Sequence, residues 1–176
     1  MNIIIRQEVE KDYKTSENII EKAFEYAEYT DHKEQFLVDR LRKSNAFIPE
    51  LSLVAEIDGV IVGHIMFSKL IIKNDEAEHQ SLALAPVSVL PEYHNKGIGS
   101  KLIIEGVKIA KDLGFKSVIV LGHEKYYPRF GFQPASKWGI KAPFDVPNEL
   151  FMALELEDGS LDGVTGTVVY PKEFFE

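Results

Sequence analysis

One continuous stretch, residues 81–121, restricts the fold more than any other part of the sequence. It begins with the apolar run SLALAPVSVL, continues through the loop PEYHNKGIGS and ends in a second apolar run, SVIVL. Between them, residues 98–113 repeat apolar side chains at three- and four-residue intervals, the pattern of an amphipathic helix. The stretch therefore predicts a strand–helix–strand crossover, whose two strands should lie parallel in one sheet.

The other expected elements place this crossover in a mixed α/β domain. Apolar runs flank Asp58 and Gly59, and Asp-Gly is favoured in two-residue turns that join antiparallel strands. Further strands are expected at 3–9 and 149–156, helices at 11–29 and 32–44, and a short helical turn at 125–130. We expect a central sheet of six to seven strands with helices on both faces.

No repeat, low-complexity tract or linker divides the 176 residues. We therefore expect a single domain, 1–176, with a core at about 2–157 and a C-terminal extension at 158–176. The apolar run near the N-terminus is too short for a signal peptide, and no later run is long enough to span a bilayer. A cytoplasmic location is expected. The oligomeric state is left open, a homodimer included.

Composition excludes several classes of function. The chain has no cysteine, so disulfides and thiolate metal sites are excluded, and its five histidines lack ligand spacing, so no metal is expected. The net charge of −8 with scattered lysines disfavours nucleic acid. An acidic surface suits a cationic substrate such as an amine, although acidity also serves solubility alone.

The loop HNKGIG brings two glycines to the point where the expected helix begins. The first amides of a helix lack partners within it, and the helix dipole makes this end electropositive. Without a Cβ, Gly97 and Gly99 would let an anion approach those amides closely. Asn95 tolerates a left-handed backbone, and His94 and Lys96 could add positive charge. A pyrophosphate cradle and a plain packing turn both fit this loop.

Two nucleotide-binding patterns are excluded at this loop. No Gly-Lys-Ser/Thr follows it, so it is not a Walker motif. Leu102 occupies the place of the third glycine in the dinucleotide fingerprint.

Pro86 lies in the middle of the strand that leads into the loop. Proline cannot donate to a β-ladder, so inside a sheet it marks a bulge or a place where pairing stops. A sheet that parts there would leave backbone groups around Val87 and Val89 unpaired, and an extended ligand with amides of its own could pair with them. A bulge without a ligand is the alternative.

The strand LAPVSVLPEY, the loop HNKGIGSKLI and the later segment YYPRFGF together resemble the GNAT superfamily of acyl-CoA-dependent N-acetyltransferases. The family's loop pattern of Gln or Arg, two residues, Gly, one residue and Gly or Ala falls on residues 94–99, where His94 replaces the usual first residue. Its aromatic signature falls on Tyr126, Tyr127, Gly131 and Phe132. The likeness covers residues 2 to about 157.

The resemblance implies a GNAT-like sheet that splays near Pro86, with acetyl-CoA as co-substrate and direct acetyl transfer to a small-molecule or peptide amine of unknown identity. The residues it implies at the cofactor are Pro86, Val87, Ser88, Val89, His94, Asn95, Lys96, Gly97, Ile98, Gly99 and Ser100. An amide near the bulge, that of Val87 or Ser88, would polarise the thioester carbonyl. Tyr127 would protonate the leaving thiolate.

The sequence leaves the general base undecided. An alkylamine with a pKa of about 10 must lose a proton before or during attack. The family often places a carboxylate on the strand before the loop, but residues 81–90 contain no acid. The remaining candidates are Glu28, Asp31, His64 and His123.

Several of these residues also have purely structural interpretations. His64 is expected to be a hydrogen-bonded interior side chain, and His123 to cap the short helical turn. Tyr126 is expected in the core, where Tyr127 could pack as well, and Arg129 in an ion pair with a carboxylate. The aromatic residues Phe144, Phe151, Phe174 and Phe175 either pack the C-terminal extension onto the sheet or form the wall of a substrate pocket.

Two other functions remain open at this point. A non-catalytic acyl-CoA sensor or subunit would need the same cofactor groove and no base, and a nucleotide-binding α/β domain would need only the loop. Among enzymes, direct transfer is favoured over a covalent acyl-enzyme, because the chain has no cysteine and no serine elbow.

Overall fold

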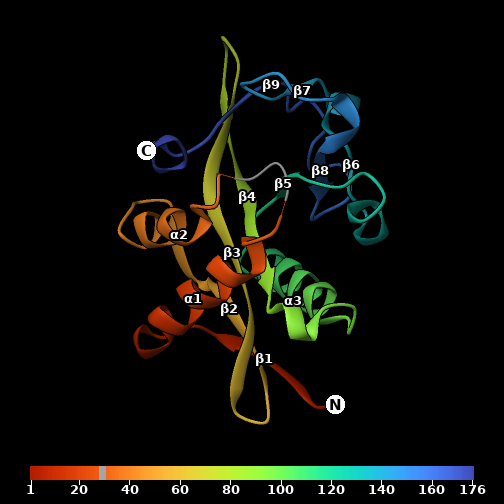
Figure 1. Cartoon of the computed structure of the whole chain (residues 1–176). Helices are drawn as coiled ribbons and strands as arrows, with labels where there is room; N and C mark the ends of the chain where they lie inside the picture. Colours follow the sequence, from red (N-terminus) through yellow and green to blue (C-terminus); the bar gives the residue numbers. More distant parts are fainter. Residues whose placement is uncertain (28–30) are drawn as a thin grey trace.

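The computed structural model describes residues 1–27 and 31–176, whose strands form one mixed sheet (Figure 1). The helices are α1 (Tyr13–Phe24), α2 (Glu34–Arg42) and α3 (Ile98–Asp112). The strands are β1 (Ile3–Gln7), β2 (Phe47–Ile57), β3 (Val60–Lys73), β4 (Glu78–Val89), β5 (Ser117–Leu121), β6 (Gln133–Pro134), β7 (Ile140–Lys141), β8 (Phe151–Glu155) and β9 (Gly166–Val169).

The sheet has the order β1-β2-β3-β4-β5-β8-β6, and β9 pairs with β3 and β7. The expected crossover is confirmed, since β4 and β5 are parallel and α3 lies between them in the chain. The described residues contain nine strands, more than the six to seven expected. The surplus comes from β6, β7 and β9, which have two to four residues each and are too short to give a periodic pattern.

The hairpin between β2 and β3 is the turn that the sequence predicts. Asp58 and Gly59 have φ angles of 51° and 79°, and Ile57 pairs with Val60 directly beyond them. Two consecutive residues with positive φ define the primed turns that match the twist of a hairpin.

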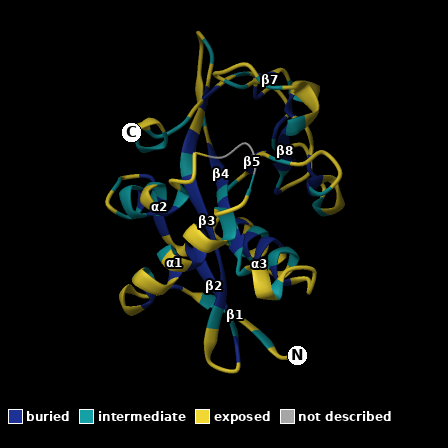
Figure 2. Ribbon diagram, in the orientation of Figure 1, coloured by how far each residue is buried: buried dark blue, intermediate teal, exposed yellow. Residues whose placement is uncertain are grey.

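The helices cover both faces of the sheet, as expected (Figure 1). Ile98, Leu102 and Ile103 of α3 join the large core cluster on one face. Ile20 of α1 and Val38 of α2 pack on the other face. Strands β3 and β4 run between these layers and are buried along their central parts (Figure 2).

Helix α1 is shorter than the expected helix at 11–29. It ends at Phe24, where the imidazole Nδ1 of His32 donates a hydrogen bond of 2.8 Å to the carbonyl of Phe24. A side-chain donor therefore takes a carbonyl at the helix end, where no intrahelical partner remains. Within the described ranges, no helix has the length and apolar content needed to cross a membrane.

The C-terminal extension pairs with β3 next to the turn that joins β3 to β4. Val168 of β9 pairs with Ile72 of β3, and β9 runs parallel to β7. The last residues, 172–175, form a short 3₁₀ helix that lies against α2. The chain end thus returns to the helical layer of α1 and α2.

Candidate functional site

Strand β4 bulges where the sequence places the proline. Ala85 and Pro86 together lie opposite Met66 of β3. Leu84 before the bulge and Val87 after it both face the core beneath α3, although regular alternation would put them on opposite faces. The bulge predicted from Pro86 is therefore confirmed.

The sheet parts at the same place. Strand β5 pairs with β4 at Leu82 and Ala83, and among the described strands none pairs with β4 on this side beyond Ala83. The splay predicted near Pro86 is thus confirmed, and the edge of β4 from residue 84 to residue 89 faces a gap.

The ladder with β3 shows which backbone groups face that gap. The amide of Leu90 donates to the carbonyl of Val62 at 2.9 Å, so this pair is hydrogen-bonded. Pairs alternate along an antiparallel ladder, so Val87 and Val89 belong to the non-bonded pairs and point their N–H and C=O groups away from β3. Consistently, the carbonyl of Val89 accepts a hydrogen bond of 2.9 Å from Nε2 of His94 instead.

The loop after β4 presents the start of α3 to the same gap. Asn95 and Gly97 adopt φ angles of 63° and 78°, the left-handed conformations expected of them. The amide of Lys101, which donates to Gly97 at 3.1 Å, is the first to bond in helical fashion. The three amides before it, of residues 98–100, have no backbone acceptor among the described residues.

A cavity of about 590 Å³ lies over these amides and the free edge of β4. Of the eleven residues predicted at the cofactor, the cavity wall includes Val87, Val89, His94, Asn95, Gly97, Ile98, Gly99 and Ser100. Pro86 and Ser88 are buried and Lys96 is exposed, and none of these three forms part of the wall. An open strand edge that leads to free helical amides suits a ligand with an amide-bearing arm and a phosphate-bearing end.

Two further residues of this cavity wall come from the short helical turn after β5, which faces the start of α3. Tyr126 packs its ring against the large core cluster, as expected, and its hydroxyl lies 3.2 Å from Oγ of Ser100. Arg129, expected to pair with a carboxylate, instead lies over the ring of Tyr126 with its guanidinium carbon 4.7 Å from the ring centre. The expectation for Arg129 was therefore wrong.

Tyr127 lies deeper than Tyr126 and forms no part of the wall of this cavity. Its ring packs against Gly122 so closely that a Cβ there would clash, and Gly122 directly follows the last residue of β5. Tyr127 is therefore near the end of β5, where this strand has parted from β4. Burial, with a contribution from Tyr126, raises the pKa of the Tyr127 phenol to about 12.

A second cavity, of about 420 Å³, opens on the other side of the bulge. Residues 83–85 of β4 and Ile119 and Leu121 of β5 contribute to its wall. The α1–α2 junction contributes as well, and so does Phe144, one of the aromatic residues that the sequence suggested for the wall of a substrate pocket. Phe174 and Phe175 also lie in this wall, whereas Phe151 is buried in the core.

The candidate bases lie in different environments in the structure. Asp31 contributes to the wall of the second cavity, and Glu28 lies outside the described residues. Nδ1 of His123 accepts a hydrogen bond from the amide of Lys125, which lies before the short helical turn (Tyr127–Phe130), and the N-cap of this turn is Tyr126 without a side-chain cap. The expectation that His123 caps the turn was therefore wrong. Among residues 1–27 and 31–176, no group of three or more His, Cys, Asp or Glu side chains is arranged to hold a metal ion.

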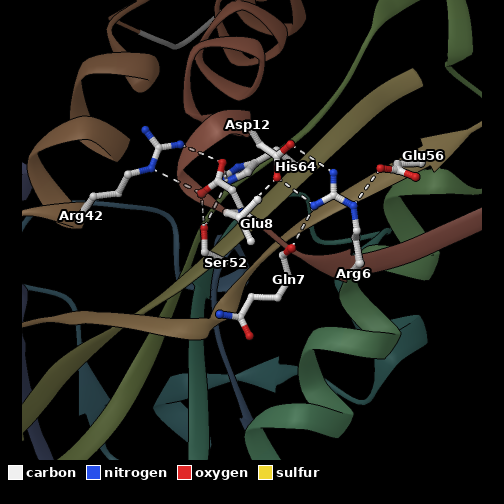
Figure 3. Close-up of polar contacts among 9 residues, drawn as sticks. Arg6, Gln7, Glu8, Asp12, Arg42, Ser52, Glu56 and His64 are labelled. Carbon is white, nitrogen blue, oxygen red and sulfur yellow. Dashed lines mark hydrogen bonds and ion pairs between the residues drawn. The ribbon is translucent and has the colours of Figure 1, made fainter. Parts of the chain in front are cut away.

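His64 is an interior side chain, as expected, and belongs to a buried polar network (Figure 3). Its Nε2 lies 3.4 Å from a carboxylate oxygen of Glu8, and Arg42 donates to the same carboxylate at 2.8 Å. Burial alone would raise the pKa of Glu8. The hydrogen bond and charge of His64, with smaller contributions from Ser16 and Arg42, instead lower this pKa to about 2.

Comparison with known proteins shows the family of this chain. The model of the acetyltransferase (GNAT) family matches residues 12–132. The N-acetyltransferase YjhQ of Escherichia coli K12, itself uncharacterized, is 41% identical over 118 residues, which are 66% of this chain and 65% of YjhQ. YhbS of the same strain, also an uncharacterized N-acetyltransferase, is 30% identical over 98% of both chains. The chain belongs to the GNAT acetyltransferase family.

Solved structures show the same fold. The crystal structure of YhbS from Escherichia coli in complex with CoA superposes with a TM-score of 0.89 at 28% identity, covering 100% of this chain and 93% of that one. A GNAT family acetyltransferase from Brucella melitensis in complex with acetyl-CoA gives a TM-score of 0.81 at 36% identity, covering 98% of each chain.

Proposed function

We propose that this protein is an N-acetyltransferase that moves an acetyl group from acetyl-CoA to a primary amine, with the whole chain acting as one domain. The observation that carries the proposal is the single cavity that joins the free edge of β4 to the free amides of α3. Two similar proteins bind CoA or acetyl-CoA, and the cavity has the backbone donors that such a ligand needs.

Two regions of the cavity would hold two different parts of the cofactor. The free amides of residues 98–100 and the positive end of the α3 dipole would hold the pyrophosphate, and Arg129 of the same cavity wall would add a positive charge. The pantetheine arm would pair with Val87 and Val89 as a surrogate strand. Gly99 lies in the cavity wall, and the absence of a Cβ there leaves its amide open to a close approach by the ligand.

In the proposed reaction the amine nitrogen attacks the thioester carbonyl carbon, a C–N bond forms and the C–S bond breaks. The amide of Val87 faces the gap and would stabilise the oxyanion. Tyr127 would give its proton to the departing thiolate, since a phenol with a pKa of about 12 is protonated at neutral pH. The amine must lose one proton, for which Asp31 is the candidate base in the acceptor cavity wall.

Two measurements test the proposal. We expect CoA to raise the melting temperature and ATP to have less effect, and we expect free thiol to be released from acetyl-CoA across an amine panel. Gly99→Val should abolish the CoA shift by filling the cradle, while Ile104→Ala, at an exposed position of α3, should retain it. CoA binding without thiol release would favour the non-catalytic sensor, and a shift with ATP alone would favour a nucleotide-binding domain.

The strength of CoA binding should depend on pH through His94. Its Nε2 already donates to Val89, so only Nδ1 is left to face a phosphate, and Nδ1 donates only when the ring is protonated. We expect CoA affinity to be higher in acidic buffer, where a protonated ring would donate from Nδ1 as well. Titration calorimetry of CoA with the unchanged protein and with His94→Gln in acidic and in alkaline buffer checks this. An unchanged pH dependence in His94→Gln would contradict it.

A further inference from the structure

The position of the second cavity along β4 makes it the candidate binding site for the amine. It touches β4 at residues 83–85, on one side of the bulge, and the cofactor cavity touches β4 at Val87 and Val89, on the other. A thioester carried along the β4 edge would therefore reach the mouth of the second cavity. The inference below rests on the proposed acetyl transfer and names the class of acceptor.

The wall of this cavity is mainly apolar. Of the fourteen described residues that form it, ten are aliphatic or aromatic and the other four are two carboxylates and two cations, so the formal charges of these described residues sum to zero. A volume of about 420 Å³ lies within the range of small-molecule pockets. A polyamine would find few acidic partners among the described residues of this wall, and a hydrophilic amine would leave most of these residues without a matching contact.

Aromatic rings form one continuous part of the wall. Phe144 stacks on Tyr170 with an interplanar angle of 13° and ring centres 6.1 Å apart, and Tyr170 contacts Phe174 at 4.9 Å and Phe175 at 6.3 Å. Phe144 and Phe175 remain 39% and 66% exposed, so part of this aromatic surface is uncovered. All four residues follow residue 132, where the family match ends.

The aromatic wall is fixed in place by α2. Nε of Arg40 donates a hydrogen bond of 3.1 Å to the carbonyl of Glu173, which holds the terminal 3₁₀ helix (Lys172–Phe175) against α2. Phe174 also packs on the apolar cluster that contains Val38 and Leu41. These contacts make the wall a part of the fold and give it a defined shape.

We infer that the acceptor is a small primary amine carried on an aromatic or bulky apolar arm, with the arm lying against Phe144, Tyr170 and Phe175 and the amino group toward the bulge. Asp31 of the wall is the carboxylate that would face the ammonium form. The C-terminal segment is then part of the acceptor site and sets its specificity.

The test compares 2-phenylethylamine with ethanolamine, which share the aminoethyl group and differ in the arm. With the full chain and saturating acetyl-CoA, kcat/KM should be about tenfold or more higher for 2-phenylethylamine, because burying a phenyl group is favourable by that order. Phe144→Ala and Phe175→Ala should each reduce this ratio. Phe36→Ala is the matched control, since Phe36 is an exposed phenylalanine of α2 outside the cavity wall, and it should leave the ratio unchanged.

A second readout separates the failure of this inference from the failure of the proposed enzyme. Binding of each amine to the CoA-saturated protein is measured by ligand-observed NMR. Binding of 2-phenylethylamine that Phe144→Ala weakens, without thiol release, would support the acceptor class and contradict the enzyme. Thiol release with ethanolamine, spermidine or a peptide preferred over 2-phenylethylamine would overturn the acceptor class and leave acetyl transfer intact. If 2-phenylethylamine is neither bound nor acetylated, the acceptor class is overturned as well.

Discussion

Replacing Arg42 with leucine should lower the free energy of unfolding by about 3–5 kcal/mol, the usual cost of leaving a buried charge without its partner. The side chains of Arg42 and Glu8 are only 4% and 0% exposed, and Arg42 also bonds Glu17 and lies over the ring of Tyr13 at 4.0 Å. Leucine removes all of these contacts and leaves Glu8 with His64 and Ser52. Thermal and urea unfolding measure the change, which should be about 6–20 °C in Tm.

Lys43→Ala is the matched control for this substitution. Lys43 forms its ion pair with Asp39 on the surface, where the two side chains are 76% and 43% exposed, so its loss should cost less than about 1 kcal/mol. A similar Tm for both variants and the unchanged protein would contradict the structural role given to the buried pair.

The destabilisation should also depend on pH with a defined sign. The pKa of Glu8 falls from an ordinary 4.5 to about 2 in the folded protein. The stability that this carboxylate contributes is therefore present above about pH 4.5 and is lost as the pH falls from 4.5 toward 2. His64 lowers this pKa more than Arg42 does, and His64 is retained in Arg42→Leu. Both proteins should therefore lose stability over that interval, and the difference between them should narrow only by the smaller contribution of Arg42.

Tyr127→Phe should lower kcat of the proposed reaction by about a hundredfold or more, the usual effect of removing a general acid, with little change in KM for acetyl-CoA. Among the described residues none forms a hydrogen bond with the Tyr127 hydroxyl, so its removal should not destabilise the fold. Steady-state kinetics at saturating amine give kcat, and thermal unfolding confirms that the variant is intact.

Tyr126→Phe is the matched control for that experiment. Its hydroxyl contacts Ser100 at the start of α3, at the end of the cavity proposed for the phosphates. We expect this variant to raise KM for acetyl-CoA more than it lowers kcat. The reverse result, with kcat lost in Tyr126→Phe and retained in Tyr127→Phe, would transfer the role of the acid to Tyr126.

The parts of the fold and site that could be predicted from sequence are those set by local backbone chemistry. Pro86 cannot donate to a ladder, and the sheet parts beside it. Gly97 and Asn95 take the left-handed conformations that few other residues adopt easily. Asp58 and Gly59 form the expected turn for the same reason.

The parts that could not be predicted depend on packing between segments distant in the chain. Glu8 and Arg42 are 34 residues apart, and neither has a neighbouring pattern that signals its partner. The orientation of Tyr126 depends on where α3 begins relative to the turn after β5. The aromatic wall of the second cavity could be predicted only with knowledge of the path of residues 158–176. The strand β9 in this segment is only four residues long.

The return of the chain end to α2 has a consequence for how such a protein could change its substrate. The cofactor cavity is formed by residues 87–129, whereas the aromatic wall of the other cavity uses Phe144 and the final segment from Tyr170 to Phe175. In the proposed reaction, the donor and the recipient of the acyl group would therefore be recognised by different stretches of one polypeptide. Exchanging the last few residues would then change the recipient that is accepted and leave the residues proposed to bind the donor unchanged.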